Sequence, residues 1–179
     1  GKGFFHIGAS GHEAAGVAAA LSLKPGVDYA YPYYRDQAFC LGLGMTSKEH
    51  LLSFLAKQDD PSSGGRQMPQ HFGHQELKIV SQSSPTGTQY LQATGLGFAL
   101  LREENHSVVY VSSGEGTTSQ GDYHEALNWA SREKAPVIFH IQNNHYAISV
   151  PIADQVSGKS VYNITAGYDS LARYDVDGC

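Results

Sequence analysis

The sequence predicts an α/β fold in which a parallel sheet is flanked by helices. Residues 107–111 (SVVYV) and 136–141 (PVIFHI) are rich in β-branched and aromatic residues, which is typical of buried strands. Residues 121–133, between these two runs, have helical periodicity. A strand, a helix and a strand in succession form a βαβ unit, which requires parallel strands and a right-handed crossover.

Two helices are predicted by the capping-box pattern at their N-terminal ends. Residues 10–13 (SGHE) precede an alanine-rich helix over 14–23, and residues 46–49 (TSKE) precede an amphipathic helix that reaches about Lys57. The remaining expected elements are a strand within 28–34 that turns into a helix ending near Leu43, a long loop at 59–75, a short strand at 78–83, a helix at 86–102, a short helix at 169–172 and a final strand at 173–177.

Composition excludes several classes of protein. The chain has 179 residues, of which 41% are hydrophobic and 16% charged, so intrinsic disorder is excluded. A net charge of −5, without any run of more than two basic residues, argues against nucleic-acid binding and against a polybasic membrane patch. With only Cys40 and Cys179, and without a signal-like or long apolar segment, the sequence favours a reducing compartment and no secretion.

Oxygen-bearing side chains follow both strands of the predicted βαβ unit. Residues 114–117 (GEGT) follow the first strand, and Asn143 and Asn144 follow the second. Parallel sheets bind ligands at the carboxyl ends of their strands, where glycines let a phosphate approach the backbone. Because Glu115 and Asn144 offer oxygen ligands at neighbouring strand ends, the pattern predicts a Mg²⁺–diphosphate site, although Asn143-Asn144 alone is more typical of a plain turn.

An acidic residue between glycines and an Asn pair, with Glu115 and Asn144 29 positions apart, resembles the thiamin-diphosphate fingerprint. Across essentially the whole chain, the sequence is similar to the alpha subunit of the dehydrogenase component of 2-oxo acid dehydrogenase complexes. The branched-chain type is the most similar, on residues 65–69 (GRQMP) with His71, residues 83–85 (SSP) with Thr88 and Gln89, and residues 143–149 (NNHYAIS).

The resemblance implies roles for individual residues. Glu115, Asn144 and the carbonyl of Tyr146 are implied Mg²⁺ ligands. The family often has arginine where this chain has Gln142, which leaves less side-chain charge to balance the diphosphate. The implied thiamin-diphosphate contacts are Tyr34, Arg35, Ser84, Thr86, Gly114, Glu115, Gly116, Thr117 and Asn144; Phe5 and Tyr33 are weaker candidates for the substrate side, and Ser83, Thr88 and Gln89 match a monovalent-cation (K⁺) site of some members.

The implied activity is oxidative decarboxylation of a branched-chain 2-oxo acid, with reductive acylation of the lipoyl group of a partner acyltransferase. The implied partner is a dehydrogenase beta subunit or a fused beta-like half, as in a heterotetramer of branched-chain amino acid catabolism. The family's proton-handling histidine would lie after residue 179, so we expect a C-terminally incomplete fragment of one thiamin-diphosphate-binding domain over 1–179 that is inactive by itself. The expected location is the bacterial cytoplasm or the mitochondrial matrix.

Three alternatives stay open. The parent enzyme could be a pyruvate- or acetoin-type dehydrogenase, or a Mg²⁺-dependent phosphohydrolase that uses Glu115 and Asn144 in the same geometry. The chain could also be a non-catalytic structural homologue that only pairs with a beta partner. Among other groups, His140 is expected to be a hydrogen-bonded core histidine. For Arg35, an alternative to the diphosphate role is a surface residue stacked on a neighbouring ring.

Overall fold

A computed structural model describes residues 3, 6–103 and 106–178 of the chain. The chain divides into two compact units, which we describe separately: the residues up to Ser84 together with Gly178, and residues 85–177. The single thiamin-diphosphate-binding domain expected over 1–179 therefore stays a prediction. Among the described residues, no helix has the length and apolar character needed to cross a membrane.

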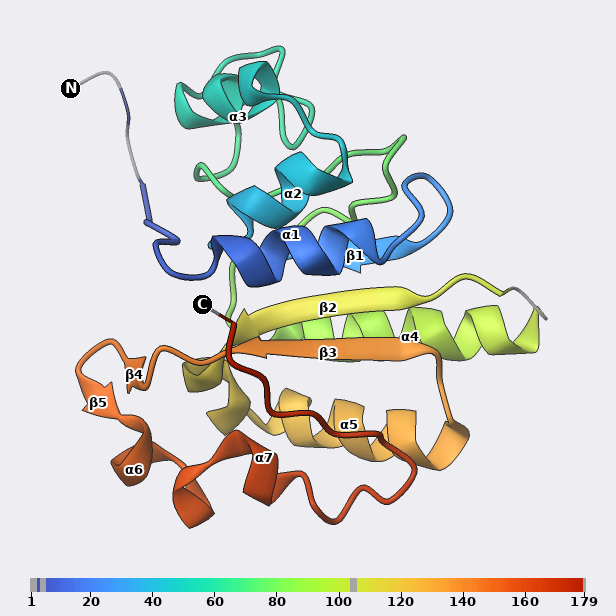
Figure 1. The fold of residues 1–179 in the computed structure, drawn as a ribbon. Coiled ribbons are helices and arrows are strands. Elements are labelled where there is room, and N and C mark those ends of the chain that lie inside the picture. The colour runs from blue at the N-terminus through green and yellow to red at the C-terminus, as the bar shows by residue number, and fades with distance from the viewer. Residues whose placement is uncertain (1–2, 4–5, 104–105, 179) are drawn as a thin grey trace. The chain divides into compact units, whose positions relative to one another are not determined.

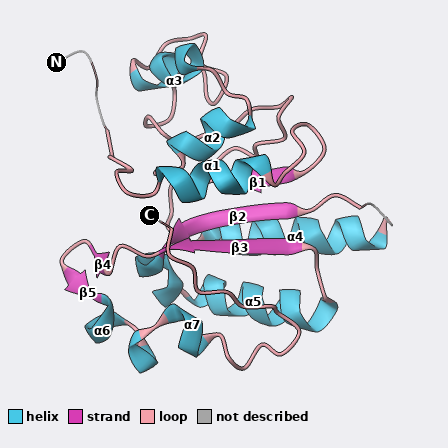
Figure 2. Cartoon of the chain, in the orientation of Figure 1, coloured by secondary structure: helices cyan, strands magenta, loops and turns pink. Residues whose placement is uncertain are grey.

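Helices and loops make up most of the first unit (Figure 2). Its core includes Phe39, Cys40 and Phe72, which are at most 2% exposed. The strand expected over 78–83 is wrong: only Ile79 bridges to Ala30 and to His74, because the chain turns sharply at Lys78, whose φ is 53°. The elements of this unit are α1 (Glu13–Leu21), β1 (Tyr29–Tyr31), α2 (Gln37–Leu43) and α3 (Ser47–Phe54).

Of the two predicted capping boxes, one is confirmed and one is wrong. At α3, the Thr46 hydroxyl accepts the N–H of Glu49, and the Glu49 carboxylate accepts the N–H of Thr46. At α1, the N-cap residue is His12 rather than Ser10, and no side chain caps the helix there. The Glu13 carboxylate instead accepts the N–H of Gly11 at 2.8 Å, so α1 begins after the predicted cap.

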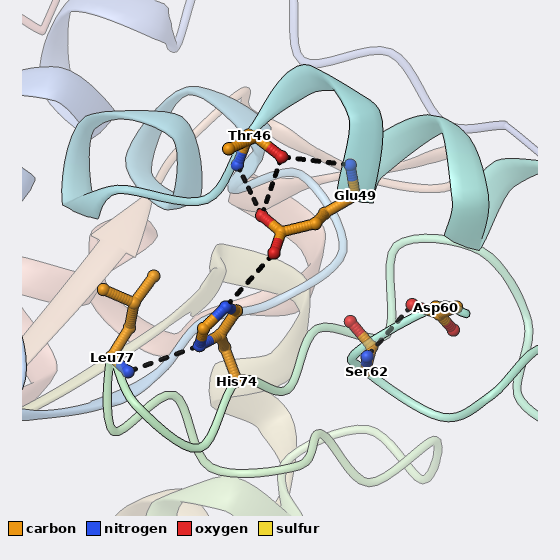
Figure 3. A network of polar contacts seen from close by, with 6 residues as sticks. All are labelled: Thr46, Glu49, Asp60, Ser62, His74 and Leu77. Carbon is orange, nitrogen blue, oxygen red and sulfur yellow. Dashed lines mark hydrogen bonds and ion pairs between the residues drawn. The ribbon is translucent and has the colours of Figure 1, made fainter.

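The long loop at 59–75 contacts α3 through a hydrogen bond between His74 and Glu49 (Figure 3). His74 Nε2 lies 3.4 Å from Glu49 Oε1, and His74 Nδ1 accepts the N–H of Leu77 at 3.3 Å. Near the start of the loop, Asp60 accepts the N–H of Ser62 at 3.0 Å. The pKa of Glu49 is lowered, first by its hydrogen bond from the Thr46 backbone and also by His74.

The second unit contains the predicted βαβ motif. In Figure 1 the arrows of β2 and β3 point the same way, and the register from Val109↔Val137 to Gly114↔Gln142 confirms that they pair in parallel. Helix α4 lies behind the two strands, and α5 connects them. These elements are α4 (Thr88–Arg102), β2 (Val109–Gly114), the 3₁₀ helix η1 (Glu115–Ser119), α5 (Gly121–Glu133) and β3 (Val137–Gln142).

Aromatic residues fill the core between α4, β2 and α5. Tyr90, Tyr110 and Tyr123 are at most 1% exposed, and the rings of Tyr90 and Tyr123 are 5.0 Å apart. A Cβ at Gly97 would lie 2.6 Å from Val137 Cγ2, so this glycine lets α4 pack closely against the start of β3. Strand β2 is buried as predicted, whereas β3 is only partly buried. His140 on β3 is half-buried and bonds to the Tyr110 hydroxyl at 2.7 Å, so its hydrogen bond is confirmed.

After β3 the chain forms short elements only. The helix expected at 169–172 is wrong, since these residues form turns, and the strand expected at 173–177 is also wrong. Tyr174 and Val176 are 83% and 77% exposed, so the alternating pattern of this segment does not bury a face. The elements present are β4 (Tyr146–Ala147), β5 (Val150–Pro151), α6 (Ile152–Gln155), the 3₁₀ helix η2 (Ser157–Lys159) and α7 (Val161–Ile164).

Candidate functional site

The carboxyl end of β2 carries a buried carboxylate. Glu115 is the first residue of η1 and is only 1% exposed. Its Oε2 accepts the backbone N–H of Asn144 at 3.3 Å, whereas its Oε1 is buried and bonds to no described residue. Burying a carboxylate oxygen without a partner is costly, so Oε1 is a site at which a cation would be stabilised.

The carboxyl end of β3 continues into a tight turn, as one of the two interpretations of Asn143-Asn144 expected. The side-chain oxygen of Asn143 accepts the N–H of His145 at 2.8 Å, and that of Asn144 accepts the N–H of Tyr146 at 3.0 Å. His145 has a φ of 70°, which Asn-rich turns accommodate. A turn at Asn143-Asn144 is compatible with the predicted site, because in this turn the N–H of Asn144 donates to Glu115.

Gly116 lies directly against the hairpin formed by β4 and β5. A Cβ at this position would be 2.9 Å from Cβ of Ala147, closer than real Cβ contacts come. The lack of a side chain therefore allows η1 and β4 to pack together, and this packing holds Tyr146 beside the loop that begins at Glu115. Gly116, which was expected to let a phosphate approach the backbone, therefore has a packing role in the structure.

Sequence reasoning missed Gln155, which also holds the Glu115 loop. Its Nε2 donates to the Glu115 carbonyl at 2.9 Å and to Ser119 Oγ at 3.0 Å, while its Oε1 is buried and bonds to no described residue. Gln155 follows Asn144 by 11 residues and a hairpin intervenes. No short motif with a fixed spacing could have identified it from the sequence.

The N-terminal end of α4 contacts β2 just before the Glu115 loop. Gln89 is 5% exposed, and its Nε2 donates to the carbonyl of Ser112 at 3.3 Å. The Thr88 hydroxyl donates to the Pro85 carbonyl at 3.0 Å, and Thr86 is exposed. Ser83 and Ser84 belong to the first unit, so the cation site expected from Ser83, Thr88 and Gln89 stays a prediction.

Arg35, the predicted diphosphate contact in the first unit, contacts Tyr34 and Gly8 of the same unit. Its guanidinium lies 5.4 Å from the ring centre of Tyr34 and donates to the carbonyl of Gly8. Tyr33 is 3% exposed, with its ring 4.8 Å from that of Tyr34. Arg35 does lie over a tyrosine ring, as the alternative interpretation had it, and the diphosphate and substrate roles of these residues stay predictions. Phe5 lies outside the described residues.

The oxygen atoms around Glu115 fit a hard divalent cation. Over residues 3, 6–103 and 106–178, no three His, Cys, Asp or Glu side chains form a metal-binding group. The implied Mg²⁺ ligands would not form such a group. They are one carboxylate, one amide oxygen and one backbone carbonyl, and only the carboxylate comes from a His, Cys, Asp or Glu residue. Mg²⁺ prefers oxygen ligands and usually takes only one or two carboxylates along with phosphate oxygens. Glu115, with its unpartnered Oε1, and Asn144 thus suit Mg²⁺.

Comparison with known proteins places this chain in a family of α/β enzymes. Residues 1–179 match the family described as "Dehydrogenase E1 component", and the chain belongs to it. This confirms the family implied by the resemblance across the chain, and it agrees with the α/β fold class predicted from the βαβ pattern.

The chain is similar to proteins named as alpha subunits of 2-oxoisovalerate dehydrogenase. It is 46% identical to that of Bacillus subtilis over 168 residues, which are 94% of this chain and 51% of the relative. It is 36% identical to the mitochondrial protein of Caenorhabditis elegans over 179 residues, 99% of this chain and 41% of the relative. A mitochondrial Arabidopsis thaliana relative is 35% identical over 97% of this chain and 39% of its own length. The chain thus spans about half or less of these relatives.

Proposed function

We propose that this chain is the cofactor-anchoring part of the alpha subunit, or alpha-like half, of a thiamin-diphosphate-dependent 2-oxo acid dehydrogenase. The observation that carries the proposal is the buried Glu115 carboxylate, whose Oε2 is held by the Asn144 N–H while its Oε1 has no partner among the described residues. Membership of the dehydrogenase E1 component family supports the same conclusion.

The residues of this chain bind and orient rather than react. Glu115 Oε1, the side-chain oxygen of Asn144 and the carbonyl of Tyr146 would hold Mg²⁺, which in turn would hold the diphosphate. The backbone around Gly114, Gly116 and Thr117, at the start of η1, would bind the phosphate oxygens. When bound, thiamin diphosphate supplies the nucleophilic carbon and the electron sink that decarboxylation of a 2-oxo acid requires.

The proposed substrate is a branched-chain 2-oxo acid such as 3-methyl-2-oxobutanoate. The proposal follows the names of the relatives, which are 2-oxoisovalerate dehydrogenase alpha subunits in bacteria and in mitochondria. The proposed partners are a beta subunit or beta-like half and a lipoyl-bearing acyltransferase, and the proposed locations are the bacterial cytoplasm or the mitochondrial matrix. On the full-length protein, competition between pyruvate and 3-methyl-2-oxobutanoate separates this proposal from a pyruvate- or acetoin-type enzyme.

The binding of Mg²⁺ tests the proposal directly. In the full-length protein assembled with its beta partner, calorimetric titration of Mg²⁺ and thiamin diphosphate would compare Glu115→Gln with Glu125→Gln, which changes an exposed residue of α5. We expect Glu115→Gln to weaken binding by at least about 100-fold, since even outer-shell changes cost about 10- to 100-fold. We expect Glu125→Gln to bind as the parent does.

Two results would contradict the proposal. Unchanged binding by Glu115→Gln would remove Glu115 from the metal site. Normal assembly of the parent protein with its beta partner, but without any binding of cofactor, would favour the alternative of a structural homologue that only pairs with a partner.

A further inference from the structure

Gln155 holds both ends of the loop that carries Glu115. Its Nε2 donates to the carbonyl of Glu115, the first residue of η1, and to the hydroxyl of Ser119, the last. The Thr118 hydroxyl donates to the same Glu115 carbonyl at 2.7 Å. Since η1 is only five residues long and the hydrogen bonds of a 3₁₀ helix have poor geometry, these side-chain bonds help to fix its conformation.

The segment that delivers Gln155 begins at the other half of the site. From Asn144 the chain runs through β4 and β5, which pair antiparallel, and the N–H of Ile152 donates to the His145 carbonyl at 2.9 Å. This closed hairpin returns α6 to η1 (Figure 1). Residues 144–155 therefore hold Glu115 twice, by its carboxylate through Asn144 and by its carbonyl through Gln155.

Holding a carbonyl and a carboxylate of one residue fixes the direction in which the side chain leaves the backbone. Glu115 Oε1 bonds to no described residue. The hydrogen bond from the Asn144 N–H to Oε2 alone would therefore let the carboxylate rotate about that bond. The Gln155 amide limits this movement by fixing the backbone at Glu115. The buried Oε1 of Gln155 also bonds to no described residue, so this amide is kept in place at a cost in desolvation.

We propose that Gln155 is a positioning residue that aims the free oxygen of Glu115 at the bound divalent cation. The proposal rests on the function proposed above and adds a residue outside the predicted ligand set. Outer-shell groups that orient a metal ligand are typically worth about 10- to 100-fold in metal affinity.

Titration of Mn²⁺, a paramagnetic substitute for Mg²⁺, tests this role without measuring turnover. The full-length protein with its beta partner and excess thiamin diphosphate would be titrated and followed by water-proton relaxation. Gln155→Met keeps the length of the side chain and removes both donors, and Asp154→Asn, on the exposed side of α6, is the matched control. We expect Gln155→Met to bind Mn²⁺ about 10-fold more weakly, with an unchanged unfolding temperature, and Asp154→Asn to match the parent.

Ser119→Ala separates the two bonds of Gln155. It removes one acceptor and leaves the bond to the Glu115 carbonyl, so we expect it to keep Mn²⁺ affinity within about 3-fold, below the range for outer-shell changes. If Gln155→Met does not assemble, Gln155→Asn answers the same question, because its shorter side chain withdraws the amide from Glu115.

Each outcome either supports or overturns the inference. Weakened Mn²⁺ binding, together with faster amide exchange confined to residues 115–119, supports it. Parental Mn²⁺ affinity in Gln155→Met overturns it, as does a loss accompanied by faster exchange throughout the second unit, which would indicate a general structural role. Glu115→Gln in the same titration separates the two proposals: if it binds Mn²⁺ normally, the proposed function fails, and if only Gln155→Met binds normally, the positioning role alone fails.

Discussion

The backbone N–H of Asn144 donates to Oε2 of Glu115 at 3.3 Å, although the two residues are 29 positions apart in the sequence. The bond connects the carboxyl ends of β2 and β3, which are aligned because Gly114 pairs with Gln142. Asn144 thus contributes its backbone to Glu115 and its side-chain oxygen to the N–H of Tyr146. The parallel register is what places all three predicted Mg²⁺ ligands on two adjacent segments.

Asn144→Ala is expected to weaken the binding of Mg²⁺ and thiamin diphosphate, because it removes the proposed oxygen ligand while leaving the backbone N–H in place. Asn143→Ala is the matched control, since Asn143 makes the same kind of turn one residue earlier. Both changes should lower the free energy of unfolding by about 0.5–1.5 kcal/mol, the usual net value of one hydrogen bond. Only Asn144→Ala should weaken cofactor binding in a calorimetric titration, and equal weakening by both variants would refute a ligand role.

Gly116→Ala is expected to destabilise the second unit. The added methyl group would lie 2.9 Å from Cβ of Ala147, so the β4–β5 hairpin must move away from η1. Overpacking of this kind typically costs about 1–3 kcal/mol. Gly121→Ala is the control, because a Cβ there meets no atom within 4 Å and alanine favours a helix. Urea unfolding measures the free energies of unfolding of both variants. Equal values would show that the hairpin moves away from η1 without a cost in stability.

Tyr90 is expected to make the protein less stable at alkaline pH. Burial raises the pKa of Tyr90 far above its ordinary value of 10.0, so the phenol stays neutral in the folded state and ionises in the unfolded state. The stability that this group contributes is therefore complete below about pH 10 and declines as the pH rises toward the folded pKa. Tyr123 behaves in the same way, because burial raises its pKa too.

Tyr90→Phe removes this pH dependence together with the hydroxyl contact to Ser113. Loss of the contact should cost about 0.5–1.5 kcal/mol at pH 7. From pH 9 to 11, the unfolding midpoint should fall less steeply in the variant than in the parent. Tyr174→Phe, at an exposed position, should leave the profile unchanged. The expectation fails if both variants follow the slope of the parent.

Glu49→Gln is expected to make α3 less dependent on pH in the acid range. The Glu49 carboxylate accepts the N–H of Thr46 at 2.7 Å and lies near His74, and these contacts lower its pKa from the ordinary 4.5. Because the folded pKa is lowered, the stability is present above about pH 4.5 and is lost as the pH falls through the folded pKa. Side-chain exposure limits the size of the effect.

Amide exchange in α3 between pH 3 and 6 measures this effect. In the parent, protection of the first turn should fall with the pH, and in Glu49→Gln it should be lower at pH 6 and change less. Glu76→Gln, at an exposed position of the same unit, should resemble the parent. Equal profiles for Glu49→Gln and the parent would show that the capping box and His74 do not couple to protonation.

Local patterns predicted the elements that depend on local interactions. The βαβ unit follows from two β-branched runs around a helical segment, and the cap of α3 follows from a threonine and a glutamate three residues apart. The pattern at residues 10–13 failed because Gly11, with a φ of 91°, turns the backbone so that Glu13 bonds to it instead. The strand predicted at 173–177 failed because alternation of residue types does not supply a neighbouring strand.

The sequence by itself determined the class of fold and, through its resemblance to known proteins, the family; it also pointed to Glu115 and Asn144, on which the proposed site depends. Hydrophobic periodicity and spacing are properties of adjacent residues, so they can be read without coordinates. Only the tertiary structure decided that Asn144 holds Glu115 by its backbone, that Gln155 holds the carbonyl of Glu115, and that one oxygen of this buried carboxylate is left without a partner among the described residues. These contacts join segments brought together by strand register and a hairpin, and such distances depend on packing across the chain rather than on any local pattern.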